Sequence, residues 1–227
     1  MVPSISIIIP ALNEAVSLPA LLQRLQPWRR RPGCEIIVVD GGSRDGTLDS
    51  SEGLADLMLQ SPAGRGSQMN AGADRANGAI LWFLHADTIP PGDGLEQITR
   101  ALESHGWGRF NVRLSGRGRM LRVVERLMNW RSCWSGIATG DQALFVRRDW
   151  FEEVGGFPDL PLMEDIAISR SLKRLGRPAC VPSVVVTSSR RWERKGAMRT
   201  IWLMWRLRLA YFLGTDPAVL ARRYDRD

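Results

Sequence analysis

The sequence is short of lysine, histidine and cysteine. Lys173 and Lys195 are the only lysines among 31 basic residues, and the chain has two histidines and three cysteines. No two cysteines stand at a spacing typical of a zinc or redox motif. Cys34 and Cys180 border strand-like runs, so we expect both to be small core residues. This cysteine usage favours a reducing compartment, the cytosol.

Long apolar runs and several binding motifs are also missing. No run approaches the roughly 20 apolar residues of a membrane-spanning helix, and Met1–Ser4 has neither the basic region nor the cleavage site of a signal peptide. Pro10–Glu14 is not the glycine-rich loop of a dinucleotide-binding or nucleotidyltransferase fold. No helix-turn-helix, zinc-finger or RNA-platform pattern is present. We therefore expect a cytoplasmic protein with no nucleic-acid partner.

Positive charge is gathered in two stretches. The net charge of the chain is +7, yet residues 109–131 and 190–208 each carry +6, so the remainder is slightly acidic. Such patches indicate an anionic partner, namely phosphates, a membrane surface or nucleic acid; the alternative is solvated surface charge. With 44% hydrophobic and 24% charged residues over 227 positions, the composition is typical of one soluble domain, with at most a short appendage.

Apolar patterns in the first 90 residues alternate between strand and helix. Alternation of this kind predicts an α/β fold in which a parallel sheet is built with right-handed crossovers. The strands are expected at 4–10, 35–40, 57–59 and 79–84, and the helices at 14–26 and 66–76, with a turn at 41–46 that leads into a short helix. Beyond Pro90 the pattern is mixed, with helices near 93–104, 121–130, 149–153, 164–175 and 197–213 and strands near 109–114, 143–146 and 179–186.

Three segments follow the expected strands directly. In open sheets of this type the ligand lies beyond the carboxyl ends of the strands. That rule selects Pro10–Glu14, Asp40–Asp45 and His85–Thr88. We expect these segments, although distant in sequence, to meet at one edge of the sheet.

Five motifs together resemble the nucleotide-binding half of family 2 glycosyltransferases. They occur over roughly residues 4–187 in the order and spacing of that family, and they are Ile8–Glu14, Val38–Thr47, Gly66–Gly72, Leu84–Thr88 and Glu164-Asp165. The resemblance implies a GT-A-like fold, with a mostly parallel central sheet flanked by helices, in a catalytic domain at 1–189. Residues 190–227 would form a basic, aromatic helical appendage. The implied reaction is inverting transfer of a sugar from a UDP-linked donor to a hydroxyl or carboxyl acceptor. An acceptor of lipid or carotenoid type would explain the basic, aromatic appendage.

The resemblance also assigns the donor nucleotide to particular residues. Asp40 would accept the imino hydrogen of uracil, Pro10 and Ala11 would supply backbone groups, and Glu14 would lie near the base or ribose. Arg65 precedes a helix whose N-terminus favours anions. Each has a structural alternative: Asp40 as a turn cap, Glu14 as a first-turn helix residue and Arg65 as a solvated arginine.

His85-Ala86-Asp87 occupies the place of the D-x-D motif of the family. There the resemblance makes Asp87 the residue that holds Mg²⁺ or Mn²⁺ against the donor diphosphate, in keeping with the preference of hard cations for oxygen ligands. His85 departs from the motif, because the first aspartate is missing. Its imidazole suits Mn²⁺ better than Mg²⁺, or it hydrogen-bonds the ribose or phosphate; a wholly structural role is the remaining alternative.

The acceptor side is assigned in the same way. The resemblance makes Asp165 the general base, with Glu164 beside it, and places Asp141 against sugar hydroxyls; a helix-dipole acid and a turn residue are the respective alternatives. Ser188–Trp192 resembles the Q-x-x-R-W motif but lacks its glutamine, and Arg191 and Trp192 would close over the diphosphate and acceptor.

The last expected helix, near 197–213, is apolar on nearly all sides, with aromatic residues next to arginines. Such a helix could rest in the headgroup region at the inner face of a membrane. The alternative is a helix that packs on the rest of the chain or in a homodimer. The rival to the enzyme hypothesis is a non-catalytic protein that binds anionic surfaces or nucleic acid through its basic patches. Binding of that kind would fall steeply with salt.

Overall fold

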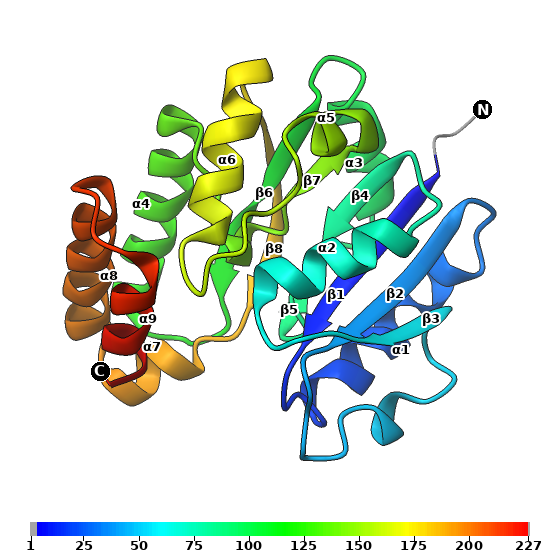
Figure 1. The fold of residues 1–227 in the computed structure, drawn as a ribbon, viewed down its shortest axis with the longest axis horizontal. Coiled ribbons are helices and arrows are strands. Elements are labelled where there is room, and N and C mark those ends of the chain that lie inside the picture. Colours follow the sequence, from blue (N-terminus) through cyan, green and yellow to red (C-terminus); the bar gives the residue numbers. More distant parts are fainter. Residues whose placement is uncertain (1–3, 227) are drawn as a thin grey trace.

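A computed structural model describes residues 4–226, and within them every side chain except those of residues 191, 194, 195, 197, 225 and 226. Helices cover both faces of an eight-stranded sheet whose strand order is β3-β2-β1-β4-β7-β6-β8-β5 (Figure 1). The strands are β1 (Ile5–Ala11), β2 (Cys34–Asp40), β3 (Leu57–Gln60), β4 (Ile80–Phe83), β5 (Thr88–Ile89), β6 (Trp107–Leu114), β7 (Phe145–Arg147) and β8 (Ala179–Thr187). The helices are α1 (Ser17–Arg29), α2 (Arg65–Arg75), α3 (Gly94–Ala101), α4 (Arg119–Ser135), α5 (Arg148–Glu153), α6 (Glu164–Leu175), α7 (Arg190–Lys195), α8 (Ala197–Phe212) and α9 (Pro217–Arg226).

The first four strands form the parallel half of the sheet, as the alternating pattern predicts. β1 lies between β2 and β4 and runs parallel to both. In this register Ala11 pairs with Asp40, and Ile8 pairs with Phe83. The carboxyl ends of β1, β2 and β4 therefore lie together, which places the segments that follow them at one edge.

The other half of the sheet is mixed. β7 runs antiparallel to β4 and β6, whereas β6 and β8 are parallel with an irregularity between Phe110 and Asn111. The two-residue β5 pairs antiparallel with β8 and brings Thr88 opposite Thr187. The sheet is mostly parallel, as expected, and its antiparallel pairs bring residues near 187 next to the segment after β4.

Alternate residues of β1 supply the two layers of the core. Ile7 and Ile9 pack in a cluster with Trp28 and Trp82, under α1 and α3. Ile8 points to the opposite face, in a cluster with Met69 of α2. Each fully buried isoleucine contributes about 1.5–3 kcal/mol relative to exposure. The strand is buried on both faces, which is why its sequence is continuously apolar rather than alternating.

The segment after residue 189 packs on the body of the molecule. Leu203 and Leu207 of α8 and Leu220 of α9 share a core cluster with Leu162, Met163 and Ile166 at the start of α6. Trp192 and Ile201 pack against Leu121 and Val124 of α4. The division into 1–189 and 190–227 stays a prediction; the two parts have core clusters in common. No helix in the described range is both long and apolar enough to cross a membrane.

The cysteine expectation needs correction. Cys133 of α4 and Cys180 of β8 form a disulfide with a Cα–Cα distance of 5.8 Å. Cys180 is therefore not a free core residue, and the pairing removes the cysteine argument for a reducing compartment. The two cysteines are 47 residues apart in the sequence, so no short cysteine motif predicts that they pair. Cys34 is free and half-buried, and burial, with Asp56 nearby, raises its pKa to about 11.

Candidate active site

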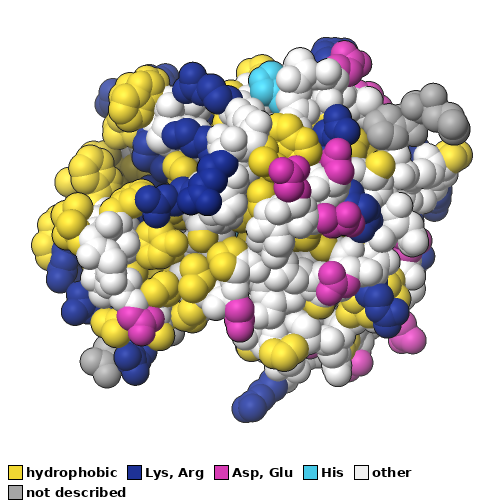
Figure 2. All heavy atoms as spheres, turned by 45° about the horizontal axis from the view of Figure 1, so that its top comes forward, with side chains coloured by type: hydrophobic (Ala, Val, Ile, Leu, Met, Phe, Trp, Pro, Cys, Tyr) yellow, Lys and Arg dark blue, Asp and Glu magenta, His cyan; other side chains and the backbone are white. Residues whose placement is uncertain are grey.

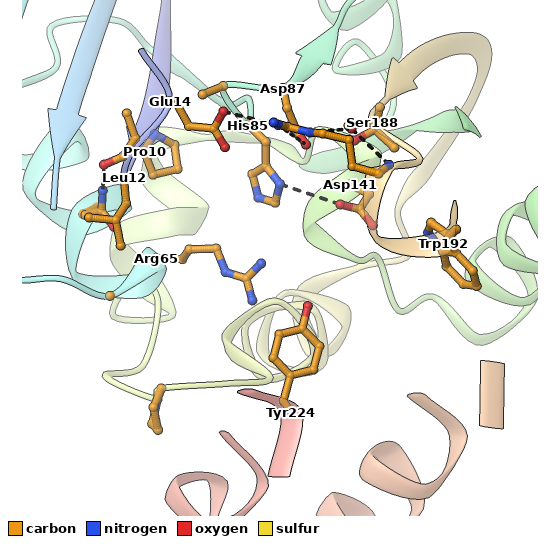
Figure 3. Close-up of a pocket in the computed structure, with 17 residues that line it drawn as sticks. Pro10, Leu12, Glu14, Arg65, His85, Asp87, Asp141, Ser188, Trp192 and Tyr224 are labelled. Carbon is orange, nitrogen blue, oxygen red and sulfur yellow. Dashed lines mark hydrogen bonds and ion pairs between the residues drawn. The ribbon is translucent and has the colours of Figure 1, made fainter. Parts of the chain in front are cut away.

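A cleft of about 1060 Å³ opens beyond the ends of β1 and β4 (Figure 3). Most of the residues predicted to contact donor or acceptor line it, from elements far apart in the sequence. These lining residues are Pro10, Ala11, Glu14, Arg65, His85, Ala86, Asp87, Asp141 and Trp192. Asp40, Glu164 and Asp165 are not among the lining residues. Two of the three predicted segments thus form the cleft wall directly.

Asp40 lies behind this wall. Its side chain is 1% exposed, and its carboxylate accepts hydrogen bonds from the backbone N–H groups of Gly42 (2.9 Å) and Ser43 (3.0 Å) and from the Ser43 hydroxyl (2.5 Å). In this arrangement the carboxylate holds the turn after β2, which is the structural alternative for this residue. A uracil ring would have to compete with these three donors.

The loop after β1 is tied to that turn. The backbone N–H of Asn13 donates to the Ser43 hydroxyl (2.8 Å), and that of Glu14 donates to Thr47 Oγ1 (2.9 Å). Glu14 stands three residues before α1 begins, so it is not a first-turn residue. Gln68, which sequence reasoning missed, donates through Nε2 to the carbonyls of Ala11 and Val39, both at 2.8 Å. These contacts fix the strand ends that line the cleft.

Acidic groups surround His85. Its Nδ1 lies 3.7 Å from Asp141 Oδ1, and Asp87 lines the same cleft (Figure 3). Burial and the nearby Arg65 charge lower the pKa of His85 to about 4, so the imidazole is neutral at pH 7. Burial, together with the charges of Asp141 and Glu14, raises the pKa of Asp87. Gly140 must be glycine here, because a Cβ would lie 2.6 Å from His85 Cε1.

A divalent cation fits this acidic wall only with a ligand supplying part of its coordination. Among the side chains that the structure describes, no group of three or more His, Cys, Asp or Glu is arranged to hold a metal. Asp87, with its neighbours Glu14 and Asp141, concentrates negative charge that a cation would offset. A cation held by one carboxylate, phosphate oxygens and water is the usual arrangement for Mg²⁺.

Arg65 and Glu164 form an ion pair at the floor of the cleft. Arg65 Nε lies 2.9 Å from Glu164 Oε1, and the glutamate is 3% exposed. Its other oxygen, Oε2, is buried and has no hydrogen-bond partner among the described residues. Burial and the adjacent Asp165 charge raise the pKa of Glu164 to about 7, and Arg65 offsets only part of that effect.

Asp165 lies behind His85. Its Oδ2 accepts the N–H of Gly140 (2.9 Å), and its Oδ1 accepts the N–H of Ile166 (2.7 Å). It lines a small cavity with Gly140 and His85, and His85 also faces the large cleft. The carboxylate predicted to be the base is therefore held in place by the backbone, and it is not among the residues that line the large cleft.

Three residues of the C-terminal helices complete the cleft. Trp192 was predicted, whereas Arg190 and Tyr224 were missed (Figure 3). Arg190 Nη2 lies 3.4 Å from Glu14 Oε2 and 3.9 Å from Asp87 Oδ2, so it spans the opening. The side chain of Arg191, the predicted residue, lies outside those that the structure describes. The choice between neighbouring arginines needs the orientation of α7, a six-residue helix without a periodic signal.

Comparison with solved structures identifies the fold. The mannosyltransferase PcManGT of Pyrobaculum calidifontis, solved with GDP-Man and Mn²⁺, superposes with a TM-score of 0.63 at 22% identity, over 99% of this chain and 65% of that one. Glucosyl-3-phosphoglycerate synthase of Mycobacterium tuberculosis, solved with Mn²⁺, UDP and glucosyl-3-phosphoglycerate, gives 0.60 at 18% identity, over 82% and 70%. The fold is that of the GT-A glycosyltransferases.

Sequence comparison then gives the family. The family model described as glycosyl transferase family 2 matches residues 6–154, more than half of the chain. The chain belongs to glycosyl transferase family 2. It is 28% identical to the probable glycosyltransferase YdaM of Bacillus subtilis over 246 aligned positions. The alignment covers 96% of this chain and 56% of that protein. The chain thus spans little more than half the length of that relative, and the family match ends before Glu164 and Asp165.

Proposed function

We propose that the protein transfers a sugar from a nucleoside diphosphate sugar, most simply a UDP-sugar, to an acceptor hydroxyl or carboxyl group with inversion of the anomeric centre. The observation that carries the proposal is the single cleft at the strand ends, where Glu14, Arg65, His85 and Asp87 meet. Family membership and the nucleotide-bound neighbours of the same fold support it. They favour an enzyme over a protein that only binds anionic surfaces.

The diphosphate would lie between Arg65 and Arg190, which face it from α2 and α7. Arginine suits phosphate oxygens because its planar fork donates two parallel hydrogen bonds. Neutral His85 can donate one hydrogen bond to ribose or phosphate and leaves the local charge to the arginines. Asp87 would hold Mn²⁺ or Mg²⁺, which when bound offsets the charge developing on the leaving diphosphate.

Asp165 is the proposed general base. The acceptor oxygen attacks the anomeric carbon, the bond to the diphosphate oxygen breaks, and the acceptor proton passes to the carboxylate of Asp165. Its two backbone hydrogen bonds hold that carboxylate at a defined position near His85. Asp141 lines the cleft directly and would bind hydroxyl groups of the acceptor or sugar.

Nucleotide binding can be tested by thermal unfolding. We expect a UDP-sugar with Mn²⁺ or Mg²⁺ to raise the midpoint by roughly 5–10 °C at a hundred times its dissociation constant. Asp87→Ala should lose the metal-dependent part of that shift, whereas Asp74→Ala, an exposed aspartate of α2, should keep it. A metal-dependent shift retained by Asp87→Ala would refute the metal assignment. No shift with any nucleotide, together with steeply salt-dependent binding to nucleic acid, would favour the rival function.

The base assignment is tested by separating binding from turnover. Asp165→Asn should keep the nucleotide-induced thermal shift but lower release of UDP from the best-bound UDP-sugar by about 100-fold or more, the usual contribution of a positioned base. Asp141→Asn is the matched control, since it alters a carboxylate of the cleft wall. If Asp165→Asn retained turnover and Asp141→Asn lost it, the base role would pass to Asp141.

The acceptor is proposed to be lipid-like, with the protein resting on an anionic membrane surface through its C-terminal helices. Trp202, Trp205 and Leu209 of α8 are 61–72% exposed. Aromatic side chains beside arginines are the composition of helices that lie at the headgroup level. A homodimer is the other occupant that such a face could have.

A further inference from the structure

Two half-buried arginines, Arg131 of α4 and Arg208 of α8, have guanidinium groups without an acceptor among the described residues. Nη2 of Arg131 and Nε of Arg208 are buried without a hydrogen-bond partner. Within the described residues, neither guanidinium has a hydrogen bond or an ion pair that would fix it. An enclosed cation in that state is costly, because its lost hydration is not replaced.

Other enclosed arginines of the chain are held by acceptors. The Arg109 guanidinium donates to the side chain of Asn111 and to the Asn129 carbonyl (3.0 Å). Arg148 donates to three carbonyls, at 2.8–3.3 Å, of residues 73, 76 and 78. Arg109 and Arg122 also have a buried Nε without a partner, but other nitrogens of each guanidinium donate to acceptors. Among the arginines with such buried nitrogens, only Arg131 and Arg208 have no acceptor at all within the described residues.

Arg131 and Arg208 lie on neighbouring helices, α4 and α8 (Figure 1). Val124 of α4 and Ile201 of α8 meet in one core cluster. Arg131 and Arg208 each follow seven residues later, two helical turns along the same face. Burial, reinforced by the charge of Arg208, lowers the pKa of Arg131 to about 10. Because α4 and α8 run in the same direction (Figure 1), two turns beyond their contact place the two cations near each other.

The pair also lies close to the start of α6, which carries Asp165: Leu207, next to Arg208, shares a core cluster with Ile166, next to Asp165. Burial lowers the pKa of Arg208, and the charges of Asp165 and Asp141 act against that effect. The charge of Asp165 acts in the same direction on Arg131. Both oxygens of Asp165 are already engaged by backbone N–H groups, so this carboxylate influences the arginines from a distance without pairing with them.

We propose that Arg131 and Arg208 form a subsite for a phosphate group of the acceptor. Two guanidinium forks supply the planar donors that phosphate oxygens accept, and the anion would offset the repulsion between the two cations. The inference rests on the proposed sugar transfer, because it makes the phosphorylated molecule the acceptor whose reacting oxygen lies near Asp165. The phosphate belongs either to a soluble phosphomonoester or to a lipid headgroup.

The test uses the intact chain with inorganic phosphate as the probe. Saturating UDP is included in one series, so that phosphate binding in the donor cleft does not contribute. Phosphate should raise the unfolding midpoint of the wild type, and its dissociation constant should rise at least about tenfold in R131Q, in R208Q and in the double variant. Arg126→Gln, an exposed arginine of α4, is the matched control and should bind phosphate like the wild type.

Stability without phosphate separates binding from structure. R208Q should be as stable as the wild type or more so in phosphate-free buffer, because it removes an enclosed charge without a partner. A lower midpoint there, with the phosphate shift intact, would overturn the proposal, as would a wild type without any phosphate shift beside bound UDP. Charge-conserving R208K should recover part of the shift.

Two arms identify the source of the phosphate. One uses glycerol 3-phosphate, and the other uses phosphatidylcholine vesicles with 20% phosphatidic acid. If the double variant loses binding to one of the probes, the subsite is supported and that probe shows whether the phosphate is soluble or part of a lipid. If the double variant binds both probes like the wild type, the proposal is overturned. UDP binding is read separately: a chain that binds phosphate at the pair but no nucleotide would leave the anion site standing and sink the proposed function.

Discussion

Asp165 and Glu164, neighbours at the start of α6, differ in the hydrogen-bond partners of their carboxyl groups. Both oxygens of Asp165 accept backbone hydrogen bonds, at 2.7 and 2.9 Å. Glu164 has one oxygen on Arg65 and one buried oxygen without a partner among the described residues. Burial therefore favours the protonated form of Glu164 and raises its pKa to about 7.

This raised pKa gives Glu164 a pH signature. In the unfolded chain the carboxyl ionises near its ordinary pKa of 4.5, but in the folded protein it keeps its proton until about pH 7. Stability should therefore fall as the pH rises from about 4.5 to 7, and change no further above that window. Relative to Glu164→Gln, which cannot ionise, the wild type should lose on the order of 3 kcal/mol across it.

Urea unfolding of the wild type and of Glu164→Gln at pH 5 and pH 8 measures how their stability difference changes with pH. Glu153→Gln, an exposed glutamate of α5, should follow the wild type at both pH values and serves as the control. If the wild type and Glu164→Gln kept the same stability difference at pH 5 and pH 8, Glu164 would be ionised throughout, as a full partner of Arg65.

At the scale of elements, the sequence predicts best where periodicity is long. The strand expected at 35–40 is β2 at Cys34–Asp40, and the helix expected at 164–175 is α6 with the same limits. α1 begins at Ser17, three residues later than expected, because Asn13 and Glu14 are tied to the turn after β2. β5 was missed, since two residues form a strand there only through pairing with β8.

The residues of the candidate site were likewise predicted where they lie at strand ends and missed where they lie on the C-terminal helices. Residues at strand ends, such as Pro10 and Asp87, line the cleft as expected because parallel strands fix where their ends meet. Arg190 and Tyr224 reach it from α7 and α9, two helices of the expected helical appendage for which no separate bounds were predicted. Their places depend on how the C-terminal helices pack on α6 and α4, which involves contacts between distant parts of the chain.

For the molecule as a whole, one face departs from an ordinary soluble surface. Hydrophobic side chains gather with arginines at the left edge of Figure 2, where α4 and α8 lie in Figure 1. Trp130 and Trp134 of α4 are stacked with centroids 6.0 Å apart, and they are 66% and 71% exposed. Arg206 lies over the ring of Trp202, 4.2 Å from its centroid. Exposed apolar area of this kind is typical of a surface that contacts another protein or a membrane.

An anionic membrane is the expected partner of this face. The intact protein should sediment with phosphatidylglycerol-containing vesicles and bind neutral phosphatidylcholine vesicles less, because the arginines attract anionic headgroups. The double variant Trp202→Ala, Trp205→Ala should bind at least about tenfold more weakly. Val16→Ala, which shortens an 87% exposed side chain outside this face, should bind unchanged.

The contrary results are distinct. If the wild type stays in the supernatant with anionic vesicles, the membrane proposal fails. A dimer in analytical ultracentrifugation that the tryptophan variant converts to a monomer would assign the face to a second copy of the chain.

The position of Arg190 has a consequence for how a donor would enter. Its guanidinium already rests on two acids, Glu14 and Asp87, across the mouth of the cleft. An arriving diphosphate would offer that cation new anionic partners, and a divalent ion would take its place beside Asp87. Donor binding would then replace the ion pairs of Arg190 with Glu14 and Asp87 by contacts with the diphosphate. Only the Arg190 side chain would need to move, and the backbone of α7 would stay in place.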